Sequence, residues 1–161
     1  MQQQRIAVVL TLAAVLAAGS IARAQSSDPW IGTWKVNLKK STYKPGPPPT
    51  EAATVKIEPS AGGIKTTIDG TNAEGKPTHT ETVAGFDGKD SPVKGAQAPN
   101  TTNALKRIDD RTFEVMGKVD GKPGVTTRVA VAADGKTMTA TQTGTNSQGQ
   151  TVNNVIVLEK Q

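Results

Sequence analysis

The residues that could catalyse a reaction in this chain are few and lie far apart in the sequence. His79 is the single histidine, so a Ser-His-Asp triad would need it as the base, and a metal site with several histidine ligands cannot form within one chain. Ser41 and Ser91 are candidate nucleophiles, but neither lies in the Gly-x-Ser-x-Gly sequence of a nucleophile elbow. The surrounding Thr78-His79-Thr80-Glu81 is typical of an exposed strand. We therefore expect no triad and no enzyme activity.

Paired carboxylates are the other candidates for acid–base chemistry or for calcium binding. Asp109 is adjacent to Asp110, and Asp87 is close to Asp90. Each pair lies in a turn-like sequence, where aspartate is common because its side chain hydrogen bonds to the local backbone. No calcium-loop spacing with a closing glutamate is present, and the absence of cysteine excludes thiolate metal sites and disulfides. We expect neither a metal nor a cofactor.

Residues 1–24 have the pattern of a cleavable secretory signal peptide. A basic start at Arg5 precedes an apolar run from Ile6 to Ala18, and Ala22-Arg23-Ala24 is typical of a signal-peptidase site. The run of about 13 residues is shorter than the roughly 20 that a helix needs to cross a membrane, so a permanent anchor is the weaker alternative. We expect residues 25–161 to form a single domain without a membrane span, located in the periplasm or outside the cell.

The charge pattern argues against a nucleic-acid partner. Two of the 19 basic residues lie in the predicted signal peptide, which leaves 17 against 14 acidic residues. The lysines are scattered and are not interleaved with aromatic platforms that stack on bases. This pattern is typical of solvated charge on strand faces and turns.

The remaining sequence is typical of an all-β domain, because short runs rich in Val, Ile and Thr alternate with Gly, Asp, Asn and Pro. The clearest strand runs from Trp30 to Leu38, with Trp30, Trp34 and Val36 on one face. A weaker strand is expected at 102–108. The other predicted strands are 53–57, 63–68, 78–84, 113–119, 125–131, 137–143 and 152–158.

Connections between these strands are predicted from Asp-Gly pairs and from prolines. Asp-Gly favours tight hairpin turns, so consecutive strands should be antiparallel neighbours. Segment 44–50 cannot join a sheet ladder because proline lacks the amide donor and fixes φ, and we expect it to be a stiff loop at one end of a barrel. Segment 90–100 is expected to be a second loop. The Asp-Gly pairs are Asp69-Gly70, Asp87-Gly88, Asp120-Gly121 and Asp134-Gly135.

The first predicted strand carries a family resemblance. Gly32-Thr33-Trp34 resembles the Gly-x-Trp opening of the lipocalin and fatty-acid-binding-protein group. That resemblance implies an up-and-down barrel closed at one end by the tryptophan, often beneath an arginine, with a small apolar ligand inside. Strand alternation places Arg128 outside the core, which leaves Arg111 as the expected partner of Trp34. The chain also resembles uncharacterised exported bacterial proteins that share Lys40-Ser41, Pro45-Gly46-Pro47, Gly149-Gln150 and Glu159-Lys160.

We therefore predict a lipocalin-like, antiparallel up-and-down β-barrel of about eight or nine strands. The leading hypothesis is a non-enzymatic binding module for a small apolar or amphipathic ligand. The alternatives are a solidly packed envelope protein that contacts an unknown partner and, third, an exported enzyme. The two tryptophans could contact the ligand or simply pack the core. The predicted ligand-binding residues are Trp30, Trp34, Val36, Phe113 and Val129.

Overall fold

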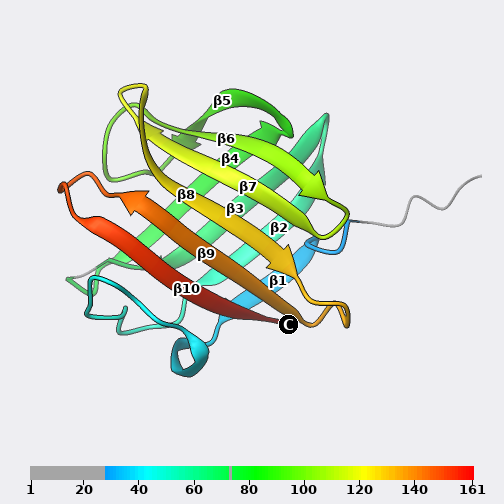
Figure 1. Cartoon of the computed structure of the whole chain (residues 1–161), viewed down its shortest axis with the longest axis horizontal. Helices are drawn as coiled ribbons and strands as arrows, with labels where there is room; N and C mark the ends of the chain where they lie inside the picture. The colour runs from blue at the N-terminus through cyan, green and yellow to red at the C-terminus, as the bar shows by residue number, and fades with distance from the viewer. Residues whose placement is uncertain (1–27, 73) are drawn as a thin grey trace, which may run out of the picture.

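Ten antiparallel strands close into a barrel in the computed structural model, which describes residues 28–72 and 74–161 (Figure 1). Each strand pairs with its neighbour in sequence, and β1 pairs with β10 to complete the ring. The predicted signal peptide and its cleavage site lie outside the described residues. The strands are β1 (Gly32–Val36), β2 (Thr54–Ser60), β3 (Gly63–Thr71), β4 (Pro77–Gly85), β5 (Asp87–Lys94), β6 (Thr101–Asp109), β7 (Thr112–Val119), β8 (Lys122–Val131), β9 (Thr137–Thr145) and β10 (Thr151–Lys160).

The antiparallel up-and-down barrel is as predicted, but the strand number corrects the expectation of about eight or nine. The additional strand is β5, most of which lies in the segment predicted to be a loop. Its sequence has no apolar alternation, and Pro92 lacks an amide hydrogen for the ladder. Nevertheless, Asp90 and Ser91 pair with β6 residues. Barrel closure therefore overrides a weak local pattern.

Two of the four Asp-Gly pairs are not turns. Asp69-Gly70 lies inside β3, and the turn follows at Asn72, whose Oδ1 accepts hydrogen bonds from two backbone amides. Asp87-Gly88 begins β5. The predicted turns at Asp120-Gly121 and Asp134-Gly135 are confirmed.

One end of the barrel is sealed by aromatic side chains, and we call it the closed end. β1 is shorter than predicted, because Trp30 precedes it and a 3-10 turn, η1, spans Leu38–Lys40. Trp30 and Trp34 are fully buried, and Trp34 Nε1 donates a 2.8 Å hydrogen bond to the Trp30 carbonyl. Phe86 and Phe113 pack against the Trp30 ring with centroids 5.6 and 5.0 Å away. The closed end therefore contains most of the aromatic core.

Arg111, the expected partner of Trp34, lies over neither tryptophan: Arg107 covers Trp30 and Lys160 covers Trp34. Arg107 lies 4.7 Å from the Trp30 ring centroid and binds both carboxylate oxygens of Asp28, at 2.9 and 2.8 Å. Arg111 instead donates to the carbonyl of Ala132. Arg128 is exposed, as predicted, and pairs with Glu114.

Lys160 covers Trp34 beside the glycine that opens the Gly-x-Trp motif. Its ammonium lies 5.2 Å from the Trp34 ring centroid, a favourable cation–π geometry. A β-carbon on Gly32 would lie 2.9 Å from Lys160 Cε, and Gly32 has a φ of +138°, which side chains rarely adopt. The backbone conformation is therefore the main reason for glycine here, since the flexible end of Lys160 could move away from a β-carbon.

Within the described residues, no helix is long and apolar enough to cross a membrane.

Candidate ligand-binding cavity

A cavity of about 480 Å³ occupies the barrel interior. Every one of the ten strands contributes at least one inward-facing side chain to its wall. On each strand that contributes more than one residue, the lining positions are two residues apart, for example Ile64, Thr66 and Ile68 on β3, because alternate strand residues face the same side. The size falls in the range of about 300–1,000 Å³ typical of small-molecule sites. The interior is therefore not packed solid.

Most of the wall is aliphatic. Toward the closed end it consists of buried side chains that include Ile64, Leu105, Met138 and Leu158. Val55 on β2 and Val93 on β5 extend the apolar wall to other strands, and Ile156 extends it along β10. An apolar molecule placed here would exchange contact with water for contact with these side chains, which is favourable.

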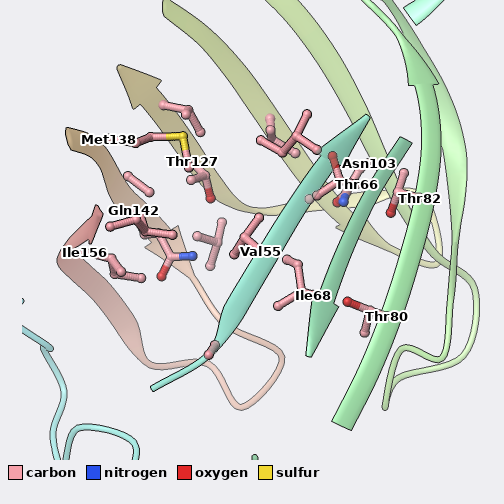
Figure 2. A pocket seen from close by; sticks show the side chains of 18 of the residues that line it. Val55, Thr66, Ile68, Thr80, Thr82, Asn103, Thr127, Met138, Gln142 and Ile156 are labelled. Atoms are coloured by element: carbon pink, nitrogen blue, oxygen red, sulfur yellow. The ribbon is translucent and has the colours of Figure 1, made fainter. Parts of the chain in front are cut away.

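A set of uncharged polar side chains interrupts this apolar wall, and we call it the polar belt. Two directly opposed cross-strand pairs belong to it, Thr66 with Thr82 and Thr127 with Gln142. Gln142 Oε1 accepts a 2.9 Å hydrogen bond from Asn154 Nδ2. Figure 2 shows these side chains among the lining residues. The belt comprises Thr66, Thr80, Thr82, Asn103, Thr127 and Gln142.

None of the described residues that line the cavity is acidic or basic. Tyr43 is the titratable side chain on the wall. Burial raises the pKa of the Tyr43 phenol, and a hydrogen bond with Ser41 opposes this shift without cancelling it. The wall is therefore electrically neutral at physiological pH.

Residues 41–53, which we call the mouth loop, approach the cavity from the end opposite the tryptophans. Tyr43, Pro49 and Ala53 from this loop line the cavity. Backbone hydrogen bonds of 2.7 and 2.9 Å join Thr42 to Val155 of β10. These contacts hold the start of the proline-rich segment beside the barrel, in agreement with the predicted loop at one end.

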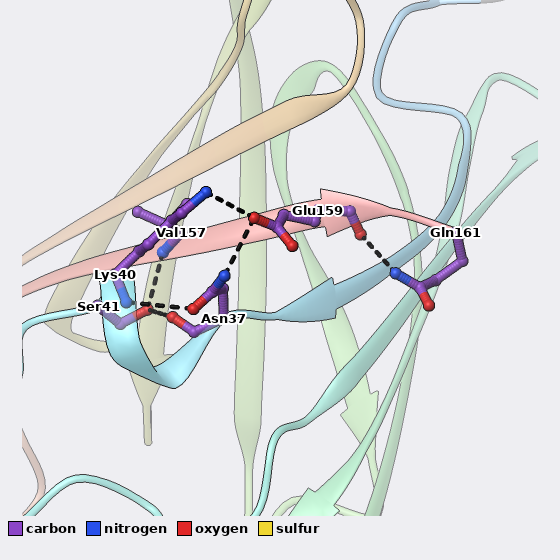
Figure 3. Close-up of polar contacts among 6 residues, drawn as sticks. All are labelled: Asn37, Lys40, Ser41, Val157, Glu159 and Gln161. Carbon is purple, nitrogen blue, oxygen red and sulfur yellow. Dashed lines mark hydrogen bonds and ion pairs between the residues drawn. The ribbon is translucent and has the colours of Figure 1, made fainter.

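The loop is also secured by polar side chains that connect η1 to β10 (Figure 3). Glu159 Oε1 accepts hydrogen bonds from Lys40 Nζ at 2.8 Å and from Asn37 Nδ2 at 3.0 Å. Ser41 Oγ donates to the Asn37 carbonyl at 2.8 Å and accepts from the Val157 amide at 3.0 Å. Ser41 therefore has a structural role in fixing where the mouth loop starts.

Three of the five predicted binding residues lie on the cavity wall, namely Val36, Phe113 and Val129. Trp30 and Trp34 lie in the buried core and are not among the lining residues. The binding role of all five stays a prediction. The sequence analysis missed the polar belt, although strand alternation could have identified Thr127, which shares a face with Val129.

None of the residues considered for catalysis is among the residues that line the cavity. His79 is exposed, and its Nδ1 lies 2.6 Å from Asp69 Oδ1 on the neighbouring strand. Asp109 Oδ1 accepts a 2.8 Å hydrogen bond from the Arg111 amide in the β6–β7 turn. In the part of the chain that the structure describes, no group of three or more His, Cys, Asp or Glu residues could hold a metal ion.

No protein-family model matches this chain, and no match was found among curated proteins. Among solved structures, it is similar to the zebrafish ileal bile acid-binding protein complexed with cholic acid. That similarity has a TM-score of 0.47 at 11% sequence identity, and it covers 83% of this chain and 99% of the other. The ligand of this chain therefore has to be inferred from its own lining residues.

Proposed function

We propose that this barrel is a non-enzymatic binding module that holds one small apolar or amphipathic molecule in its interior. The cavity of about 480 Å³, enclosed by side chains from all ten strands, is the observation that supports this function. Protein interiors are normally packed to the density of organic crystals. A barrel with a purely structural role would be expected to fill this space with larger side chains.

We also propose that the protein works outside the cytoplasm. The signal-peptide pattern of residues 1–24 supports this location. In an aqueous compartment outside the cytoplasm, such a module would shield its apolar ligand from water, and removing apolar surface from water is favourable.

The first test is native mass spectrometry of the mature protein recovered from its own compartment, compared with its denatured mass. We expect a stoichiometric additional mass that is lost on denaturation. Titration with N-phenyl-1-naphthylamine, a neutral fluorophore, tests the cavity directly and should give saturable binding. A bare chain together with no saturable fluorescence change would contradict the proposal and favour the packed interaction module.

A pair of variants on β9 shows whether the fluorophore binds inside the barrel. Ala140 lines the cavity, whereas Thr143 on the same strand is exposed and does not line it. Ala140→Phe should occupy lumen volume and weaken fluorophore binding by about tenfold or more, equivalent to about 1.4 kcal/mol. Thr143→Phe adds the same side chain outside and should leave the affinity unchanged. Equal effects would contradict binding in the lumen.

A further inference from the structure

We infer that the cavity selects uncharged ligands, which have an apolar body and neutral hydrogen-bonding groups such as a hydroxyl, carbonyl or amide. This inference rests on the proposed function and specifies the chemistry of the ligand at that same site. It excludes carboxylates, phosphates and amines that would enter the lumen in their charged form.

The composition of the wall is the first observation behind this selectivity. The lining residues are aliphatic, aromatic or neutral and polar, and none supplies a formal charge. A carboxylate transferred from water into such a site would lose its hydration without gaining an ionic partner. Burial of an unpaired charge is strongly unfavourable, whereas a neutral polar group needs only a hydrogen bond.

Two arginines close in sequence to the wall are engaged elsewhere. Arg107 is two residues from Leu105 of the wall, but it is held at the closed end by two hydrogen bonds to Asp28. Arg128 lies between two lining residues of β8, yet it is exposed and pairs with Glu114 at 3.0 Å. Strand alternation points Arg128 to the outer face. Arg107 has the same parity as Leu105, but its guanidinium lies over the Trp30 ring and is held there by Asp28, so neither arginine can neutralise an anion in the lumen without rearrangement.

The polar belt supplies what a neutral polar ligand group needs. The side-chain amides of Asn103 and Gln142 can each donate and accept, and the threonine hydroxyls can do both. In Figure 2 these groups project from different strands among the aliphatic lining residues. An uncharged hydroxyl or carbonyl inside the barrel can therefore be hydrogen bonded, which removes most of the cost of burying it.

Competition against bound N-phenyl-1-naphthylamine tests this selectivity with three molecules that share one hydrocarbon chain. These are dodecanol, methyl dodecanoate and dodecanoate, compared at neutral pH. We expect both neutral compounds to displace the fluorophore at concentrations at least about tenfold lower than dodecanoate, a difference of about 1.4 kcal/mol. Equal or tighter binding of dodecanoate, for example with its carboxylate at the mouth beside exposed Lys44, would overturn the inference.

Two variants at one position of the polar belt then test whether a charge in the lumen changes the ligand preference. Asn103→Lys places a cation in the lumen. It should raise the affinity for dodecanoate and lower the affinity for dodecanol. Asn103→Leu removes the amide without adding charge. The affinity for dodecanol should therefore fall, and the affinity for dodecanoate should stay low. Circular dichroism shows whether each variant is folded, and Thr127→Lys replaces Asn103→Lys if it is not. If the introduced lysine does not raise the affinity for dodecanoate in a folded variant, the inference is contradicted.

The outcomes separate the inference from the function on which it rests. If the fluorophore does not bind and no competitor shows binding by mass spectrometry, the proposed function fails. If the fluorophore binds and dodecanoate competes as well as dodecanol, the binding function stands and only the selectivity is wrong.

Discussion

Single residues at the closed end show how strongly the barrel depends on its first strand. Trp34 is fully buried, donates a hydrogen bond to the Trp30 carbonyl and is covered by Lys160. It belongs to the core cluster but not to the cavity wall. Its indole supplies a large buried area in a core otherwise built mainly from smaller side chains. We therefore expect its contribution to be to stability.

Replacing Trp34 with alanine separates a packing role from a ligand contact. Trp34→Ala should lower the free energy of unfolding by about 3–5 kcal/mol, because it removes a large buried side chain and leaves a cavity. Urea denaturation measures this loss, and fluorophore titration of the folded variant measures binding. We expect the affinity of the folded protein to change little. A selective loss of affinity at unchanged stability would instead make Trp34 a ligand contact.

At the scale of elements, the strands are not equally well paired. β9 and β10 are in register from Thr137 opposite Glu159 to Thr145 opposite Thr151. β4 and β5 pair only at Glu81 with Lys94 and at Thr82 with Val93. Between these strands Phe86 packs against Trp30 and Phe113 in the closed end. The β4–β5 seam therefore has the fewest directly paired residues in the ring.

Hydrogen exchange should reveal this seam. Amides that lack a cross-strand partner open more readily, so peptides covering 83–92 should exchange faster than peptides covering 151–158. Exchange followed by mass spectrometry under native conditions makes the comparison within one molecule. Equal protection of the two segments would show that β4 and β5 pair along their full length in solution.

Across the whole molecule, charge is kept on the outside of a neutral interior. Several carboxylates that are at least partly exposed have their pKa lowered by groups that stabilise the ionised form. A hydrogen bond from Lys65 is the main cause for Glu81, and one from Lys40 is the main cause for Glu159. The backbone amides of Lys89 and Arg111 act in the same way on Asp87 and Asp109.

These lowered pKa values predict a barrel that is destabilised by acid. Because the folded state holds these protons more weakly than the unfolded state, their contribution is present above the ordinary carboxyl pKa of about 4 and is lost as pH falls through the lowered values. The urea midpoint should be flat above about pH 5 and should fall below about pH 4. Each contribution is small because the groups are exposed. In Glu159→Gln the urea midpoint should fall less in acid than in the unmodified protein. A midpoint of the unmodified protein that stays constant or rises in acid would contradict the prediction.

The amino-acid sequence alone determined the all-β class, the antiparallel order and most strand positions. These properties follow from a local pattern, the alternation of apolar and polar residues between turns. The same alternation predicted that Arg128 would be exposed and that Val129 would face inward, as observed. The prolines of segment 44–50 also predicted a stiff loop at one end of the barrel, and the mouth loop lies there.

The tertiary structure decided the rest, because those features depend on contacts between residues far apart in the chain. β5 has no alternating pattern, and its inclusion follows from pairing with β6 as the ring closes. Arg107 reaches Trp30 and Asp28 only because the fold brings β6 next to the segment that precedes β1, which no local spacing predicts. The open lumen is likewise a property of all ten strands together, since its volume is what their inward side chains leave unfilled.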